Sequence, residues 1–279
     1  MLKRTITSLV GLAVVIPVLW FSDTYAFVAF VTLVSVLAAH EMLGCIGQRK
    51  ELAVSIPFYA VAVLIPLISR AFGTVYLFCT VALGIMFVYT FYLLSLSVLT
   101  RGRYLVKDAA LATTLCAYIV FASVSLVLLR DMDGIGKYVF LLPFVGAWVS
   151  DIFAYLCGRF FGRHKLIPEV SPKKTVEGMI GGILFTMLGF ALYAFVISKI
   201  YDIVPNYIAM LIVGGIVSLV SQLGDLVASI IKRQFNIKDY GKLLPGHGGV
   251  MDRFDSILAV SPFLFIMISI VISFTTLFA

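Results

Sequence analysis

The chain has 279 residues, of which 62% are hydrophobic and only 13% are charged. Soluble domains average roughly 45–50% apolar and about 25% charged residues, so this composition excludes a soluble globular enzyme, a disordered chain and a disulfide scaffold. The net charge of +7 would suggest a nucleic-acid partner in a soluble protein, but none is expected for so apolar a chain. We predict an all-α, polytopic membrane protein.

Apolar stretches long enough to cross a bilayer recur along the whole chain. A helix needs about 20 apolar residues to cross the hydrocarbon core. By this measure the sequence predicts about nine transmembrane helices, at 5–22, 24–46, 52–69, 73–99, 108–129, 136–158, 177–200, 206–232 and 254–278. Because a second span follows the first at once, the first is expected to be a retained anchor rather than a cleaved signal peptide. We divide the chain into 1–135, with five spans, and 136–279, with four.

The basic residues indicate how these spans are oriented. If the nine spans alternate in direction, 17 of the 21 Lys and Arg residues fall on one side of the membrane. Cytoplasmic loops carry the excess of Lys and Arg, so we expect a cytoplasmic N-terminus and an external C-terminus. The two long connections, 159–176 and 233–253, are both charged and both cytoplasmic in this arrangement. Long loops often carry function, which places the expected chemistry at the cytoplasmic face.

Several ionisable residues lie inside or at the edge of predicted spans, where charge is costly and therefore indicates function. Asp151 lies in the sixth span, Asp225 in the eighth, and His40 and Glu41 in the second. The eighth span also carries a polar stripe, because helical spacing places one set of residues on a single face. This set is Ser221, Asp225, Ser229, Lys232 and Arg233. An interhelical ion pair is an alternative role for Asp225.

The segment that follows the eighth span concentrates carboxylates, cations and glycines. Asp252 and Asp255 are three residues apart, so their carboxylates point the same way on a helix. Together with Asp225 they form a set of hard oxygen ligands that suits Mg²⁺. The glycines of Gly246-His247-Gly248-Gly249 allow the backbone to approach a ligand closely, and they precede a helix start, where amide groups favour phosphate. The neighbouring cations are Lys232, Arg233, Lys238 and Arg253.

The other long loop repeats this pattern just before the seventh span. The stretch 171–178, SPKKTVEG, combines Lys173 and Lys174 with hydroxyl side chains. A basic anchor at the cytoplasmic end of a span is one interpretation, and contact with phosphate is the other. Carboxylates, cations and a glycine turn in two cytoplasmic loops are typical of metal-assisted phosphoryl or nucleotidyl transfer.

These residues resemble the signature of phosphatidate cytidylyltransferases, also called CDP-diacylglycerol synthases. The similarity extends without departure over 229–255, SIIKRQFNIKDYGKLLPGHGGVMDRFD, and the regions of Asp151 and 171–178 are also similar to that family. The resemblance implies a membrane enzyme that makes CDP-diacylglycerol and pyrophosphate from CTP and phosphatidate. It also implies Mg²⁺, with a second cation as an option, a homodimer, and a place in the bacterial inner membrane with the site near its cytoplasmic face.

The resemblance further implies a role for individual residues. Asp225, Asp252 and Asp255 would act in catalysis as metal ligands, with Asp151 as a supporting ligand. Lys232 and Arg233 would act in catalysis on phosphate groups. The remaining substrate contacts would come from Ser171, Lys173, Lys174, Ser229, Lys238, His247, Gly248, Gly249 and Arg253. Gly178 and Gly182 offer a small-residue face for helix association.

Two alternatives differ in the chemistry they require. A CTP-dependent polyprenol or phytol kinase would transfer the terminal phosphate to a hydroxyl, and a general base would assist it. An ion-coupled transporter would use Asp151 and Asp225 as an intramembrane site, but transport predicts polar residues spread through the bilayer depth. Here they gather at one edge, which disfavours transport.

Overall fold

The computed structural model describes residues 11, 13–72, 74–246 and 248–270, so residues 5–10 and 12 of the predicted first span lie outside the described residues, and residues 13–20 of that span are helical. The chain divides into two compact units, one formed by Met1–Leu128 with Ile237–Arg253 and the other by Leu129–Asn236 with Phe254–Ala279. The loop after the eighth predicted span therefore groups with the N-terminal helices. Sequence order alone does not indicate this grouping.

Beyond residues 13–20, which are also helical, the described part of the first unit includes α2 (Tyr25–Cys45), α3 (Leu52–Leu67), α4 (Val75–Leu99) and α5 (Val106–Arg130), the last of which ends in the second unit. Threonine side chains cap two of them, because Thr24 accepts a hydrogen bond from the Ala26 N–H and Thr74 accepts one from the Leu77 N–H. Such caps satisfy N–H groups that have no partner inside the helix. α2 packs against α3, and α3 packs against α4.

The second unit contains α6 (Gly136–Val139), α7 (Leu142–Phe161), β1 (Lys165–Ile167), β2 (Ser171–Thr175), α8 (Val176–Tyr201) and α9 (Tyr207–Gln234), together with most of α10 (Met251–Ile270). β1 and β2 form an antiparallel hairpin inside the predicted loop 159–176. The hairpin is the one strand pair among the described residues, and the sequence pattern does not predict it. The fold is otherwise all-helical, as predicted.

Six helical segments in the described residues are long and apolar enough to cross a membrane: α2, α4, α5, Gly136–Phe161, α8 and α9. α3 is apolar but has only 16 residues and contains Pro57 and Pro66. These segments coincide with predicted spans to within a few residues and fit a polytopic membrane protein. The count of nine spans and the orientation of the termini remain predictions.

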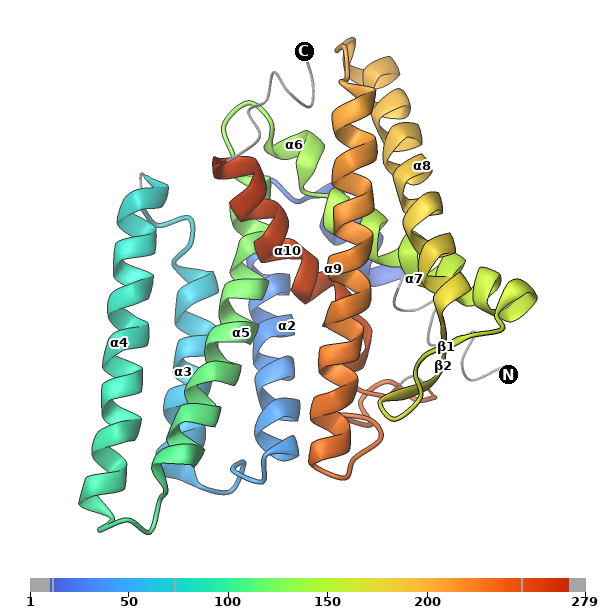
Figure 1. Ribbon diagram of the computed structural model, residues 1–279. Helices are drawn as coiled ribbons and strands as arrows, with labels where there is room; N and C mark the ends of the chain where they lie inside the picture. Colours follow the sequence, from blue (N-terminus) through green and yellow to red (C-terminus); the bar gives the residue numbers. More distant parts are fainter. Residues whose placement is uncertain (1–10, 12, 73, 247, 271–279) are drawn as a thin grey trace. The chain divides into compact units, whose positions relative to one another are not determined.

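Glycines bring α7, α8 and α9 close together. A Cβ atom at Gly178 would lie 2.6 Å from the backbone oxygen of Ala154, and one at Gly182 would lie 3.2 Å from that of Ser150. α8 and α9 run side by side (Figure 1) and pack along their length. The small-residue face of Gly178 and Gly182 is thus used for helix packing within the chain.

Candidate active site

The β1–β2 hairpin places two neighbouring lysines differently. Lys165 pairs with Thr175 and Ile167 with Ser171, and the Thr175 hydroxyl accepts the Gly178 N–H at 3.1 Å to cap α8. Because side chains alternate along a strand, Lys173 is exposed whereas Lys174 is partly buried. The hairpin and the cap together direct the Lys174 side chain toward α9.

Lys174 forms an ion pair with Asp225 of α9. Its Nζ lies 2.7 Å from Asp225 Oδ2 and donates a hydrogen bond of 3.2 Å to the Gln222 carbonyl oxygen. Gln222 in turn donates through Nε2 to the Ser218 hydroxyl and to the Met179 carbonyl oxygen. The ion-pair alternative for Asp225 is therefore realised, with the partner on the hairpin rather than on another helix.

Asp225 belongs to a wider charged cluster, which comprises Asp151, Lys174, Asp225, Lys232 and Asp255. Asp255 of α10 is only 7% exposed and accepts the Ser256 N–H at 2.7 Å. It interacts electrostatically with Asp225, Asp151 and Lys232. Three carboxylates from α7, α9 and α10 thus share their surroundings with two lysine ammonium groups. All five residues are among those predicted from the sequence, whereas the pairing of Lys174 with Asp225 is not.

The first unit holds the glycine-containing loop that ends at α10. Gly246 and Gly248 have φ values of 78° and 87°, a region that favours glycine. The Leu244 N–H donates a hydrogen bond of 2.9 Å to the Gly248 carbonyl oxygen. Asp252 Oδ2 accepts the N–H groups of Tyr240 at 2.8 Å and Gly249 at 2.9 Å. One oxygen of this predicted metal ligand therefore already has a structural role in holding the loop.

Glu41 of α2 was noted as an intramembrane charge but received no site role in the sequence analysis. Its two carboxylate oxygens accept the N–H groups of Val250 and Met251, at 2.9 and 2.8 Å. The helix-start amides that we expected to favour phosphate are thus occupied by Glu41. This contact could not be predicted, because Glu41 and α10 are far apart in the sequence. The isolated charge of Glu41 in an apolar span was the one indication that it has a role.

The remaining predicted site residues take varied positions. Ser229 is partly buried on α9 and Ser171 is partly buried at the start of β2; the exposed cations are Lys173, Arg233, Lys238 and Arg253. His247 lies outside the described residues. Within the part of the chain that the structure describes, no three His, Cys, Asp or Glu side chains form a ready metal centre. The metal assignment remains a prediction.

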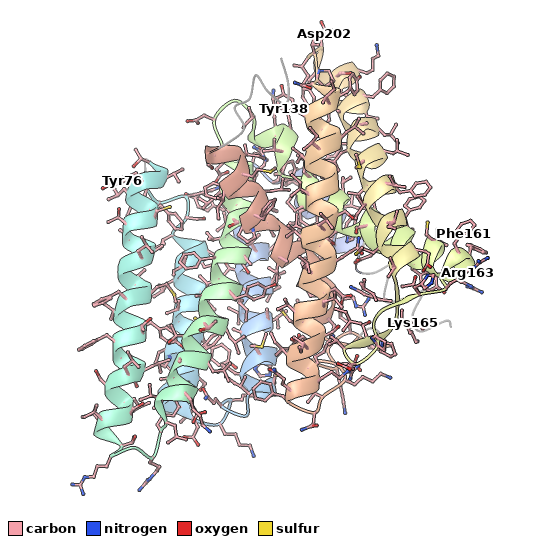
Figure 2. All side chains as sticks on the ribbon, viewed as in Figure 1. Tyr76, Tyr138, Phe161, Arg163, Lys165 and Asp202 are labelled. Atoms are coloured by element: carbon pink, nitrogen blue, oxygen red, sulfur yellow. The ribbon has the colours of Figure 1, made fainter. Side chains whose placement is uncertain are left out.

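A second charged feature lies beside the hairpin. His164 Nδ1 lies 2.7 Å from Glu177 Oε1, and the His164 backbone N–H also donates to the Glu177 carboxylate. Figure 2 shows Phe161, Arg163 and Lys165 together at the end of α7 and the start of the hairpin. His164 is therefore both exposed and paired with a carboxylate.

The fold and the site define an integral membrane protein with a cluster of carboxylates and cations contributed by several helices. The chain belongs to the Cytidylyltransferase family, whose profile matches residues 2–271. It is 35% identical over 265 residues to a phosphatidate cytidylyltransferase of Staphylococcus haemolyticus, which covers 95% of this chain and 98% of the relative. Phosphatidate cytidylyltransferases of Staphylococcus epidermidis and Staphylococcus aureus are 33% and 34% identical, with the same coverage of both chains.

Proposed function

We propose that this chain is a phosphatidate cytidylyltransferase, which makes CDP-diacylglycerol and pyrophosphate from CTP and phosphatidate. The observation that carries the proposal is similarity along 95% of the chain to relatives with that name. The shared length includes both charged loops and every helix of the charged cluster, so the similarity is not confined to the apolar spans.

The reaction needs no general base. A phosphate oxygen of phosphatidate would attack the α-phosphorus of CTP, and the bond from that phosphorus to the bridging oxygen of pyrophosphate would break. A phosphate monoester is mostly doubly ionised near pH 7, because its second pKa is about 6. The main obstacle is repulsion between the lipid dianion and the triphosphate, and cationic side chains reduce it.

The cations of the site divide into two groups by their exposure. Lys173, Arg233, Lys238 and Arg253 are exposed, which leaves them accessible to phosphate groups of CTP or phosphatidate. Lys174 is held by Asp225 and the Gln222 carbonyl oxygen, and Lys232 interacts with Asp255. We propose that the exposed cations bind substrate phosphates, whereas Lys174 and Lys232 keep the buried carboxylates charged and in place.

The chemistry of the carboxylates supports a proposed site for a divalent cation. Asp225, Asp255 and Asp151 offer carboxylate oxygens, the hard ligands that suit Mg²⁺, and they interact with one another and with Lys174 and Lys232. These three residues, with Asp252, would hold Mg²⁺, and a second cation remains an option. Such an ion would supply positive charge near the phosphate oxygens when bound. Chelation by EDTA should therefore abolish turnover, and added Mg²⁺ should restore it.

The wider setting also belongs to the proposal. The excess of Lys and Arg in alternate loops supports nine spans, a cytoplasmic N-terminus, an external C-terminus and a site near the cytoplasmic face. The bacterial relatives support the bacterial cytoplasmic (inner) membrane as its location. We further propose a homodimer, on the basis of the family resemblance and without use of the Gly178–Gly182 face.

Purified protein incubated with phosphatidate, CTP and Mg²⁺ tests the activity. We expect pyrophosphate and a nucleotide-bearing lipid in equal amounts, and neither product when any one of the three components is omitted. Replacement of phosphatidate by diacylglycerol is the matched control, because it removes the attacking phosphate and keeps the acyl chains. Pyrophosphate release that does not depend on phosphatidate would contradict the proposal.

A further inference from the structure

Glu41 is a buried carboxylate that takes no part in the reaction described above. It is 4% exposed on α2, and each of its oxygens accepts one backbone N–H, from Val250 and from Met251. Both N–H groups belong to the start of α10, where the helix supplies no acceptor of its own. Glu41 therefore caps α10 from a helix that lies about 200 residues earlier in the chain.

The glycine loop is shaped around this carboxylate. A Cβ atom at Gly241 or at Gly249 would collide with the Glu41 carboxylate group. Gly249 also donates its N–H to Asp252 Oδ2, which accepts the Tyr240 N–H as well. Glu41 and Asp252 thus hold one loop through four backbone hydrogen bonds, and displacement of Glu41 releases two of them.

The burial of a charge at this point is costly unless hydrogen bonds and opposite charge offset it. The two N–H groups and the positive end of the α10 dipole supply part of that compensation. Arg49 interacts electrostatically with Glu41, and its guanidinium is fixed by two hydrogen bonds, of 3.2 and 2.9 Å, to the His40 carbonyl oxygen. Ordinary capping needs only a Ser, Thr, Asp or Asn next to the helix in sequence. A buried carboxylate from a distant helix therefore indicates that the start of α10 must be held in a defined position.

We propose that Glu41 is a positioning residue, which holds the start of α10 so that Asp252 is placed for nucleotidyl transfer. This inference rests on the proposed function. Glutamine cannot replace Glu41, because its side chain offers one acceptor oxygen and turns an NH₂ donor toward the second N–H. Aspartate retains both oxygens but is one methylene shorter.

The test compares Glu41→Gln with the matched control Glu51→Gln in the purified full-length protein. Glu51 is exposed at the N-cap of α3, where its side chain makes no capping hydrogen bond. In Glu41→Gln we expect kcat to fall by up to about 10²-fold, the scale of a misplaced catalytic group, with KM for both substrates unchanged. Hydrogen exchange should accelerate in a peptide that contains Val250 and Met251. Glu51→Gln should match the wild type in all three measurements.

A second variant reaches the same contact from the loop side. Gly241→Ala should displace the Glu41 carboxylate, whereas Gly84→Ala adds its methyl group where no atom lies within 4 Å. We expect Gly241→Ala to lower kcat. The double variant Glu41→Gln/Gly241→Ala should have a kcat no lower than that of the less active single variant, because both substitutions disrupt the same interaction. Gly84→Ala should retain wild-type kcat.

The outcomes separate this inference from the proposed function. If the wild type makes no nucleotide-bearing lipid, the proposed function fails and the positioning role fails with it. If the wild type is active and Glu41→Gln retains its kcat, only the positioning role is overturned. A rise in KM at unchanged kcat would overturn it as well, since that pattern indicates a binding contact. All rates are measured well below the unfolding temperature of each variant, so a purely structural loss leaves kcat intact.

Discussion

At the scale of single residues, Asp225 has a charge of opposite sign and a charge of like sign beside it. Its carboxylate pairs with Lys174 and also interacts with the buried Asp255. Two carboxylates in partly dehydrated surroundings repel each other and require nearby positive charge to stay ionised. The residues could be named from sequence because charge is rare in apolar spans. The ion pair could not, because the loop sequence does not reveal that β2 turns Lys174 toward α9.

Replacement of Asp225 by Asn tests its role, because Asn keeps the size and removes the charge. We expect turnover to fall on the order of 10²–10³-fold, the scale of losing one electrostatic contact in an active site, while the protein remains folded. Asp252→Asn and Asp255→Asn should behave alike. Asp239 is exposed in the loop and is the matched control, so Asp239→Asn should lower turnover much less. An essential Asp239 with a dispensable Asp225 would overturn the assignment.

The neighbouring lysines should respond differently to replacement by Ala. Lys174 and Asp225 are both partly exposed, and such a pair contributes at most about 1 kcal/mol to the free energy of unfolding. Lys174→Ala should therefore lower turnover far more than stability. Lys173→Ala should raise KM for CTP at unchanged unfolding temperature, because Lys173 is exposed. Steady-state kinetics and thermal unfolding together separate the two variants. Identical behaviour of both would contradict the proposal that Lys173 binds substrate whereas Lys174 holds a carboxylate.

At the scale of elements, most helices could be predicted to within a few residues because bilayer thickness sets their length. The predicted spans 24–46 and 206–232 became Tyr25–Cys45 and Tyr207–Gln234. The hairpin could not be predicted, since strands of three and five residues in a polar loop leave too little alternation to recognise. The contact of Glu41 with α10 could not be predicted for another reason. Helical periodicity indicates only which residues close in sequence share a face.

The packing of α8 against α7 supplies a stability prediction. A methyl group at Gly178 would lie 2.6 Å from a backbone oxygen of α7, and backbone cannot move aside as a flexible side chain can. Gly178→Ala should lower the free energy of unfolding by about 1–3 kcal/mol, the usual cost of overpacking. Gly215→Ala in α9 is the control, because its methyl group would meet Met187 at an ordinary 3.4 Å. Thermal unfolding in detergent gives the comparison, and equal effects would contradict it.

At the scale of the whole molecule, the topology determines which compartment supplies CTP. Cysteines introduced at Gln234 and Asn206, at opposite ends of α9, should react with an impermeant thiol reagent from opposite sides of the membrane. Gln234 should react from the cytoplasmic side. The unmodified protein is the control, because its described cysteines are buried or only partly exposed. Reaction of both positions from the same side would remove a span from the arrangement.

The fate of each phosphate of CTP tests the central claim most directly. A cytidylyltransferase breaks the bond between the α- and β-phosphates, so label at the α-phosphate should enter the lipid and label at the γ-phosphate should leave in pyrophosphate. Both labels are followed in parallel with phosphatidate as the acceptor. Recovery of γ-label in the lipid, with CDP as the other product, would indicate a CTP-dependent kinase and contradict this account.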